Sequence, residues 1–354
     1  MTRAIIAGSG SEIACNLVTN EMLARIMETS DAWIRERTGV ETRYFVDPGT
    51  STTDLGVAAA GRALESARLQ PSDIDMVVFA TMTPDHLFPG CGGLLQARMG
   101  LRTIPCFDIR QQCSGFLYGL QLADAQIRAG AARTILLVGA EVHSGFMPWS
   151  PGCWARLYGD ADAVVTEEER AVNTKTRHLS VLFGDAAAAV VVQAHDGPDR
   201  GVIDSLLGAD GSAADKLWVP GVGFARRPYV DHAQLDALEY VPSMDGHAVF
   251  KMATAKMAEA ARQVMERNGV SPADLKMVLM HQANRRINEF VQRMLGLPDE
   301  KVLHNIQKYA NTTSATIPLL WDECVRTGRL APGDLALLVG FGAGMTWGAT
   351  LVRA

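Results

Sequence analysis

The chain repeats itself at an offset of 201 residues, and this repeat strongly limits the folds that it can adopt. Three pairs of blocks keep the register; they begin at Ile5 and Leu206, at Pro71 and Pro272, and at Leu136 and Leu337. The period is far longer than the ~20–50 residues of solenoid repeats. We therefore predict two duplicated half-domains, residues 1–200 and 201–354, with one active site built at the seam between them.

Length and composition are those of a globular protein. The chain has 354 residues, which suits two units of ordinary domain size. Hydrophobic residues make up 48% and charged residues 20%, unlike a disordered chain. The formal net charge of −6 argues against nucleic-acid binding, which requires a basic surface. No run approaches the ~20 apolar residues of a membrane span, and the first residues lack the apolar stretch of a signal peptide.

Cysteine usage indicates a reducing compartment. None of the six cysteines forms a Cys-x-x-Cys pair, and no His and Cys residues have zinc-ligand spacing. Thiols without short regular spacing are typical of reduced cysteines in a cytosolic protein. We therefore expect a cytoplasmic protein with no metal site and no association with a membrane.

Buried strands and amphipathic helices alternate along both halves, which predicts an α/β fold with covered sheets. The expected strands are Ala4–Ala7, Met76–Ala80, Ile104–Ile109, Thr134–Val138, Met277–Met280 and Leu335–Val339, with a last edge strand at Leu351–Arg353. The expected helices are Asp54–Leu69, Ser114–Arg128, Lys251–Asn268 and Ser314–Thr327. Residues 21–47, 144–180 and 211–244 are expected to be loop insertions, where specificity usually resides.

Cys113 is the candidate nucleophile. It follows the expected strand Ile104–Ile109 and lies at the start of an amphipathic helix, where the positive end of the helix dipole favours a thiolate. The alternative is a buried apolar cysteine, which is the commoner role and the one that we expect for Cys15, Cys106 and Cys324.

Two polar residues of the second half are related to the thiol by the repeat. His281 directly follows the strand Met277–Met280, and α/β folds bind ligands at the carboxyl ends of their strands. Asn311 precedes a helix, so it is either a helix cap or a site residue. His281 is equivalent to Ala80, and Asn311 lies close to the equivalent of Cys113. A pseudo-twofold arrangement would therefore bring the thiol, the imidazole and the carboxamide to one cavity.

The turn Gly340–Met345 is rich in glycine and follows a strand. It has neither the lysine nor the spacing of a phosphate-binding loop. Its exposed backbone N–H groups are better suited to binding an oxyanion.

Together these motifs resemble those of the β-ketoacyl-acyl-carrier-protein synthase III family, which has the thiolase fold. The resemblance covers nearly the whole chain and rests on four motifs: Cys113-Ser114-Gly115-Phe116, His281-Gln282-Ala283-Asn284, Asn311-Thr312-Thr313-Ser314-Ala315 and Gly342-Ala343-Gly344-Met345-Thr346-Trp347-Gly348. It implies a five-layered αβαβα sandwich and a homodimeric acyltransferase of fatty acid biosynthesis. The implied reaction joins an acyl-CoA to a malonyl thioester, malonyl-acyl-carrier protein, with loss of CO₂ and with no cofactor.

The resemblance also implies the role of each residue in this reaction. Cys113 would be acylated by the acyl-CoA, and the backbone N–H groups of Cys113 and Ala343 would bind the oxyanion. His281 and Asn311 would stabilise the enolate that forms when the malonyl group loses CO₂.

Further residues would bind the partners of the reaction. Trp33, Arg37 and Arg286 would hold coenzyme A, Phe88 would reach across the homodimer and limit the acyl chain, and Lys251, Arg286 and Arg293 would dock an acidic carrier protein.

The chain departs from the family pattern at several positions. Ala343 replaces a usual glycine, His247 replaces a usual asparagine, and Gln112 stands where a small residue is common. The insertion at residues 144–180 is longer than the housekeeping enzymes need. We therefore expect a secondary member that accepts something bulkier than acetyl-CoA.

Three other functions compete with this one. A specialised secondary-metabolite ketosynthase or acyltransferase would use the same Cys-His-Asn set on another acceptor. A degradative thiolase needs another reactive cysteine near the C-terminal glycine loop, and no cysteine follows Cys324. A non-catalytic scaffold subunit would not need an intact set of Cys113, His281 and Asn311.

Overall fold

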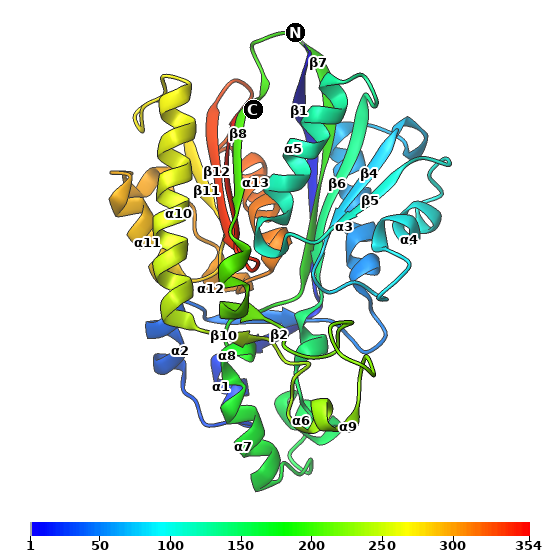
Figure 1. Cartoon of the computed structure of the whole chain (residues 1–354), viewed down its shortest axis with the longest axis vertical. Helices are drawn as coiled ribbons and strands as arrows, with labels where there is room; N and C mark the ends of the chain where they lie inside the picture. The colour runs from blue at the N-terminus through cyan, green and yellow to red at the C-terminus, as the bar shows by residue number, and fades with distance from the viewer. Residues whose placement is uncertain (1) are drawn as a thin grey trace.

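Two β-sheets form the centre of the molecule in a computed structural model that describes residues 2–354 (Figure 1). The first sheet has five strands in the order β1-β7-β6-β4-β5, and the second has four in the order β11-β12-β13-β8. The strands of the first sheet are β1 (Thr2–Ile13), β4 (Met76–Ala80), β5 (Cys106–Ile109), β6 (Thr134–Glu141) and β7 (Ala186–Asp196). Those of the second are β8 (Gly201–Ala209), β11 (Met277–Met280), β12 (Leu335–Gly342) and β13 (Thr346–Arg353).

Strand pairing repeats at the offset found in the sequence. Val77 pairs with Leu136 in the first sheet, and Val278 pairs with Leu337 in the second. Both pairs of strands are parallel, and all four strands are buried along their whole length. Parallel strands that are covered on both faces are expected to be continuous apolar runs, as these are. The division into domains at residue 200 stays a prediction.

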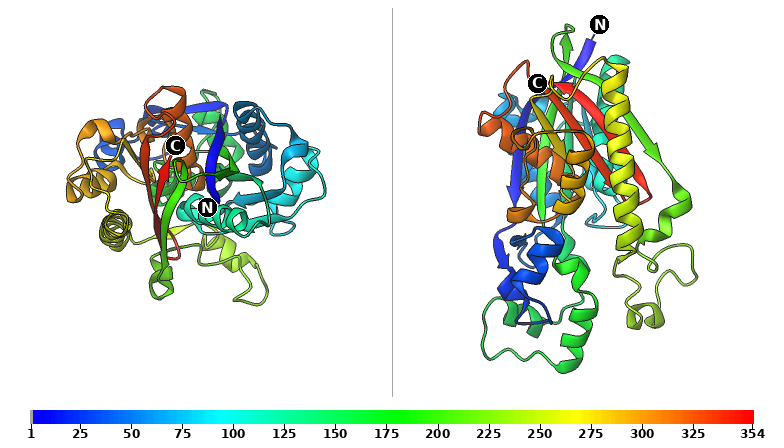
Figure 2. Two further views of the ribbon diagram at one scale, coloured as in Figure 1. Left: turned by 90° about the horizontal axis from the view of Figure 1, so that it is seen from above. Right: turned by 90° about the vertical axis from the view of Figure 1, so that its left-hand side faces the viewer.

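Helices cover both sheets and separate them (Figures 1 and 2). Three hydrophobic clusters fill the four interfaces between helices and sheets, because one of them spans both inner faces. The result is a five-layered αβαβα sandwich, as the sequence predicted. Helices α5 (Gly115–Arg128) and α13 (Thr316–Arg326) lie between the sheets, α3 (Thr52–Ala67) and α4 (Cys91–Arg98) cover the outer face of the first, and α10 (Gly246–Arg267) and α11 (Arg285–Met294) cover that of the second.

The first two predicted loop insertions are folded, so the prediction that they are loops was wrong. They pack on each other in a hydrophobic cluster that includes Ile34, Phe45, Trp149 and Leu157, below the sheets in Figure 1. Segment 21–47 contains α2 (Asp31–Thr38) and β3 (Thr42–Phe45), which pairs with β2 (Asn16–Thr19); segment 144–180 contains α6 (Pro151–Leu157), α7 (Glu167–Lys175) and α8 (Arg177–Ser180). Segment 211–244 is mostly irregular, with short β9 (Leu217–Trp218), α9 (His232–Asp236) and β10 (Ser243–Met244).

Three strand assignments in the two central sheets differ from the prediction. Leu351–Arg353 is the end of β13, which lies between β12 and β8 and is therefore not an edge strand. Strands β7 and β8 were not predicted, although β7 lies inside the first sheet between β1 and β6 and β8 forms an edge of the second. Within residues 2–354, no helix is long and apolar enough to cross a membrane.

Candidate active site

Cys113, His281 and Asn311 line one cavity of about 140 Å³. Their exposed fractions are 8%, 1% and 4%, so all three are buried. The structure thus brings together the three residues that the repeat had related. Apolar side chains form most of the remaining wall: Leu217, Met244, Val249, Phe250, Ala253, Met257 and Ile287.

A tight turn before α5 holds Cys113. Gln112, the residue directly before Cys113, has a φ of 44°, which lies in the left-handed region. This conformation is strained for a residue other than glycine, and such strain is concentrated at functional sites. The hydroxyl of Ser114 donates to the carbonyl of Thr346 at 3.1 Å, which ties the turn to the start of β13.

Burial of the Cys113 thiol opposes the thiolate that the start of the helix favours. Burial, and then the nearby Glu141, raise the pKa of this thiol to about 12. Hydrogen bonds from the backbone N–H of Cys113, the side chain of Thr313 and the backbone N–H of Ala343 lower the pKa only in part. Desolvation outweighs the helix dipole because the thiol lies in a closed cavity. The thiol proton must therefore leave during attack on a substrate.

The end of β12 approaches the backbone of Cys113 closely. A Cβ atom at Gly342 would lie 2.9 Å from the Cys113 nitrogen and 3.0 Å from the Cys113 Cβ, so only glycine fits. The next residue, Ala343, directs its backbone N–H at the thiol. The N–H groups of Cys113 and Ala343 therefore both point toward the thiol, and their role as an oxyanion site stays a prediction.

His281 directly follows β11 and presents one ring nitrogen to the cavity. Its Nδ1 lies 2.7 Å from the hydroxyl of Thr316, and its buried Nε2 has no partner among residues 2–354. Burial, and then the nearby His143, lower the pKa of the ring to about 3. The imidazole is therefore neutral, and Nε2 is available to a substrate atom.

Asn311 acts locally as a cap and also lines the cavity, and its catalytic role stays a prediction. Its Oδ1 accepts from the backbone N–H of Thr313 at 2.9 Å, and its own N–H donates to the carbonyl of Leu182 at 2.8 Å. Among residues 2–354 its Nδ2 has no protein partner. The carboxamide therefore offers N–H donors to the cavity.

Glu141 is a buried carboxyl group near the site that the sequence interpretation missed. It ends β6 and accepts from the hydroxyls of Ser314 at 2.7 Å and Thr83 at 2.8 Å. Burial raises the pKa of this carboxyl to about 7 against the opposite effect of its hydrogen bonds. A single charged residue at the end of the apolar run Thr134–Glu141 was the signal that could have identified it.

The predicted coenzyme A residues lie outside this cavity. Trp33 is flanked by two guanidinium groups, with Arg37 at 4.5 Å and Arg177 at 4.2 Å from its ring centroid. Arg177 comes from segment 144–180, and no motif distinguishes it from the other arginines there. Arg286 is exposed in the first turn of α11.

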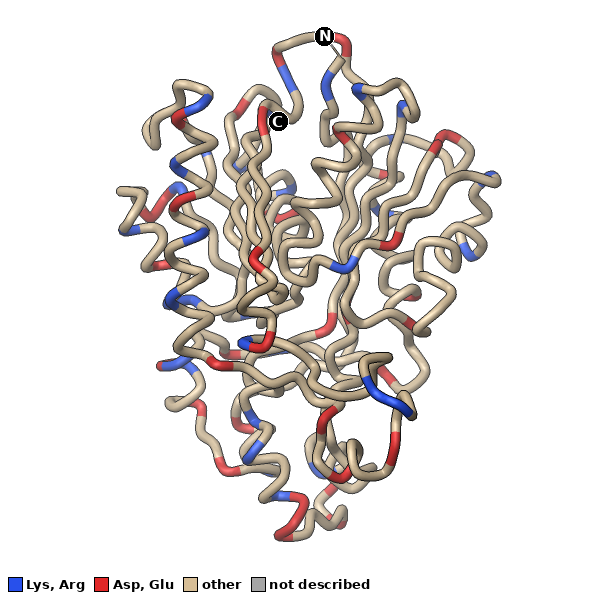
Figure 3. The backbone as a smooth tube through the Cα atoms, viewed as in Figure 1, with Lys and Arg blue, Asp and Glu red and all other residues tan. Residues whose placement is uncertain are grey.

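Phe88 does not reach the cavity of its own chain. Its exposed fraction is 80%, among the highest of the large hydrophobic side chains described. Lys251 on α10 and Arg293 on α11 are exposed on adjacent helices of the outer layer. Figure 3 shows basic and acidic residues interspersed along these two helices.

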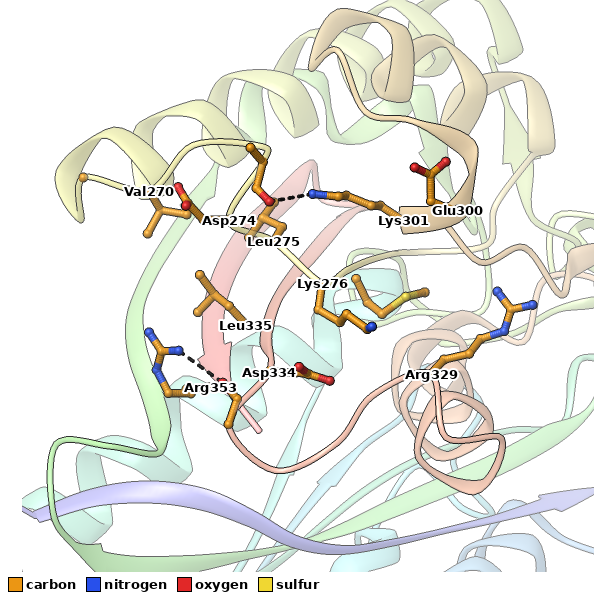
Figure 4. Close-up of a pocket in the computed structure, with 14 residues that line it drawn as sticks. Val270, Asp274, Leu275, Lys276, Glu300, Lys301, Arg329, Asp334, Leu335 and Arg353 are labelled. Carbon is orange, nitrogen blue, oxygen red and sulfur yellow. Dashed lines mark hydrogen bonds between the residues drawn. The ribbon is translucent and has the colours of Figure 1, made fainter.

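A larger hollow of about 860 Å³ lies where β11 and β12 begin, at the opposite strand ends from His281 (Figure 4). Its cations include Lys276, Lys301 and Arg329, and Lys301 already donates to the carbonyls of Pro272 and Ala273. Its lining contains no Cys, Ser or His, so the smaller cavity is the candidate active site. Within residues 2–354 no three His, Cys, Asp or Glu side chains are placed to hold a metal ion.

Comparison with known proteins shows similarity along the whole chain. Residues 107–171 and 164–211 match the family described as 3-oxoacyl-[acyl-carrier-protein (ACP)] synthase III, and residues 265–354 match its C-terminal region. The β-ketoacyl-[acyl-carrier-protein] synthase III of Rhizorhabdus wittichii is 39% identical over 353 residues, which cover 100% of both chains.

Two solved structures have the same fold. The 3-oxoacyl-[acyl-carrier-protein] synthase III of Aquifex aeolicus superposes with a TM-score of 0.84 at 34% identity, covering 99% of this chain and 100% of that one. A priming β-ketosynthase of the R1128 polyketide biosynthetic pathway superposes with a TM-score of 0.83 at 30% identity, covering 99% and 96%.

Proposed function

Because the chain belongs to the 3-oxoacyl-[acyl-carrier-protein] synthase III family, we propose that Cys113, His281 and Asn311 divide the steps of the family's reaction between them. The enzyme is an acyltransferase that condenses an acyl-CoA with malonyl-acyl-carrier protein. The single observation that carries the division of roles is that thiol, imidazole and carboxamide share one buried, largely apolar cavity.

Acylation comes first. The sulfur of Cys113 attacks the thioester carbonyl of the acyl-CoA and loses its proton, and coenzyme A leaves as the thiol. The tetrahedral oxyanion accepts hydrogen bonds from the N–H groups of Cys113 and Ala343. These donors are fixed by the close approach of Gly342 to Cys113, so they need no rearrangement when the charge develops.

Decarboxylation and condensation follow at the other side of the cavity. The malonyl thioester loses CO₂, and negative charge collects on its thioester oxygen. Asn311 Nδ2 donates to this oxygen. His281 Nε2 donates as well once the hydroxyl of Thr316, which in the structure donates to the carbonyl of Thr313, turns to donate to Nδ1. The enolate carbon then attacks the acyl group on Cys113, which gives the β-ketoacyl product and restores the thiol.

The substrates bind at two exposed surfaces. The guanidinium of Arg177 lies on the ring of Trp33, so it moves aside when the adenine of coenzyme A stacks on that ring, and Arg37 and Arg286 pair with the phosphates. Lys251, Arg286 and Arg293 attract the acidic carrier protein to the outer face of α10 and α11.

The functional unit is a homodimer. The exposed Phe88 does not line the cavity of its own chain, which agrees with insertion into a second copy, where it would limit acyl length. Light scattering should give twice the mass of one chain; a monomer would remove this role of Phe88. The cytoplasmic location stays a prediction.

One experiment tests the proposal as a whole. The protein is incubated with a panel of acyl-CoAs from acetyl to octanoyl, and intact mass spectrometry with peptide mapping locates any adduct. Malonyl-acyl-carrier protein is then added and the CO₂ released is measured. We expect a thioester on Cys113 and CO₂ release with at least one acyl group bulkier than acetyl. The absence of any adduct would overturn the proposal.

A second function is favoured by the likeness to the priming β-ketosynthase. A specialised ketosynthase or acyltransferase would acylate the same thiol and pass the group to another acceptor. An adduct on Cys113 with octanoyl-CoA, without CO₂ release from malonyl-acyl-carrier protein, would favour this function.

A further inference from the structure

Helix α11 carries an exposed aromatic ring within the surface that we assign to the carrier protein. Arg286, Phe290 and Arg293 are spaced four and three residues apart, so they form one stripe along the outer face of this helix. Phe290 is 39% exposed. Among residues 2–354, no acidic side chain pairs with Arg286 or Arg293, whereas Arg285 pairs with Glu289 at 2.8 Å. The stripe therefore offers a partner an apolar centre and positive charge that no carboxylate neutralises.

Phe290 also contacts the wall of the catalytic cavity. Its ring packs edge-to-face on that of Phe250 from α10, with 5.9 Å between centroids and 71° between planes. Phe250 lines the cavity that contains Cys113. On the outer side, the guanidinium of Arg293 lies 5.7 Å from the centroid of the Phe290 ring. A continuous series of contacts therefore leads from a surface cation through two rings to the cavity.

The cavity must widen before condensation can take place. Its volume is about 140 Å³, whereas sites that enclose a ligand of drug size measure ~300–1,000 Å³. After acylation it has to hold the acyl group and the malonyl thioester together. The side chains of Val249, Ala253 and Met257 are buried in the core beneath α10. Phe250 is partly exposed, so its ring belongs to the part of the wall that a docked partner can influence.

We propose that Phe290 couples docking of the acidic carrier protein to widening of the cavity, which makes it a positioning residue that acts through Phe250. This inference rests on the proposed function. Without a partner, Arg293 covers Phe290, and Phe290 holds the ring of Phe250 against the cavity. A carboxylate of the carrier draws Arg293 away, because an ion pair is stronger than an exposed contact between a cation and a ring. Phe290 then turns toward the partner, and Phe250 follows it outward.

The coupling favours one donor of the malonyl group over another. A malonyl group on the carrier protein arrives with the acidic surface that opens the cavity. Malonyl-CoA lacks this surface and meets the narrower cavity. Since couplings between two sites commonly amount to ~5–150-fold, removal of the Phe290 ring should improve the use of malonyl-CoA by at least the lower figure.

The first measurement is alkylation of Cys113 by N-ethylmaleimide in the absence of carrier, followed by intact mass with peptide mapping. F290A and F250A should react about fivefold faster than the wild type or more. F290Y, which keeps the ring, should react like the wild type. M294A is the matched control, because Met294 is also 39% exposed on α11 and has no ring to pack on Phe250. Alkylation of Cys324, which is buried between the sheets, reports any loss of fold.

The second measurement is condensation by acylated protein with malonyl-CoA and with malonyl-acyl-carrier protein. F290A should raise kcat/KM for malonyl-CoA about fivefold or more and leave kcat for the carrier substrate unchanged. F250A should give the same gain, and F250A/F290A no further gain. M294A should raise KM for the carrier substrate alone, because it removes docking area without changing the cavity.

Three outcomes would overturn the coupling: no gain in alkylation and malonyl-CoA use by F290A, an equal gain by M294A, or gains of F250A and F290A that multiply in the double variant. If F290A loses its fold, R293A gives the same test without a change to either ring, and it too should alkylate faster. Absence of an acyl adduct on wild-type Cys113 would instead refute the proposed function, and the alkylation comparison does not depend on that adduct.

Discussion

Gln112 and Thr313 are 201 residues apart and share a left-handed backbone, with φ of 44° and 50°. Each directly precedes an equivalent position of the repeat, Cys113 in the first half and Ser314 in the second. The two turns have therefore kept one strained conformation while their side chains have diverged. Cys113 faces the cavity, whereas Ser314 donates to Glu141 at 2.7 Å.

Cys113 is the only cysteine that we expect to become acylated. C113A should give no adduct with any acyl-CoA. C324A is the matched control because Cys324 is also buried, with its pKa also raised to about 12 by burial, but lies in the core between the sheets. C324A should acylate like the wild type, read by intact mass. A thioester on C113A would place the nucleophile elsewhere.

His281 and Asn311 should be needed after acylation rather than for it. H281A and N311A remove the donors to the enolate oxygen, and loss of one such donor commonly costs about 10²–10³ in rate. Each variant should therefore form the acyl-enzyme and lose CO₂ release by about this factor. Acyl adduct and CO₂ are measured on the same sample. Equal loss of acylation would show that the division of roles is wrong.

Most of the central strands and the principal helices could be predicted from their apolar patterns. Wholly apolar runs such as Met76–Ala80 and Met277–Met280 fit few positions in a fold other than a buried strand. Strand β7 escaped because its first four residues are alanines, which favour helices, and only pairing with β1 and β6 makes them a strand. The position of Leu351–Arg353 inside the sheet likewise depends on its pairing with β8.

The catalytic cavity could be predicted from the repeat, because equivalent turns of the two halves meet where the halves pack together. The protonation state of Cys113 could not be predicted, because desolvation of the thiol depends on how completely the surrounding layers exclude water. Arg177 could not be chosen from sequence for a similar reason. Its partner Trp33 is remote in the chain, and no local spacing marks this contact.

Glu141 should make stability depend on pH in a way that E141Q abolishes. The pKa of its carboxyl is raised from 4.5 to about 7 in the folded protein. The contribution of this shift to the free energy of unfolding is therefore fully present below pH 4.5 and is lost as the pH rises through 7. The free energy of unfolding of the wild type should fall relative to that of E141Q by about 3 kcal/mol between these limits. Urea denaturation at pH 4.5 and 7 measures the difference.

The variant E36Q is the control for that measurement, because the side chain of Glu36 is 79% exposed. Its stability difference from the wild type should not change between the two pH values. An E141Q difference that is equally flat would contradict the burial of an ionisable carboxyl beside Cys113.

Trp33 should contribute to binding of the nucleotide and not to chemistry. W33A should raise KM for acyl-CoA about tenfold, since an aromatic stacking contact of this kind is worth ~1–3 kcal/mol. Acylation by an acyl-N-acetylcysteamine thioester, which lacks the nucleotide, should be unchanged. R35A on the same helix is the control, because Arg35 pairs with Asp31 and Glu41. An equal effect of W33A on both thioesters would contradict nucleotide stacking.

The outer face of α10 and α11 should recognise the carrier protein by charge. The triple variant K251E/R286E/R293E should raise KM for malonyl-acyl-carrier protein by about tenfold or more, and the effect should weaken at high salt. Condensation with malonyl-CoA, which presents no carrier surface, measures the background effect of the substitutions. K276E, which alters an exposed lysine at the far end of β11, should behave as the wild type.

The divergence of Cys113 and Ser314 has a chemical consequence for the whole molecule. Two sulfur atoms on these two turns could oxidise to a disulfide or compete for a single acyl group. An alcohol anchored to a carboxylate at one of the two places removes both hazards. Each monomer therefore carries one acyl group per cycle. Ser314 has a structural role and helps to hold the acylated Cys113 in place.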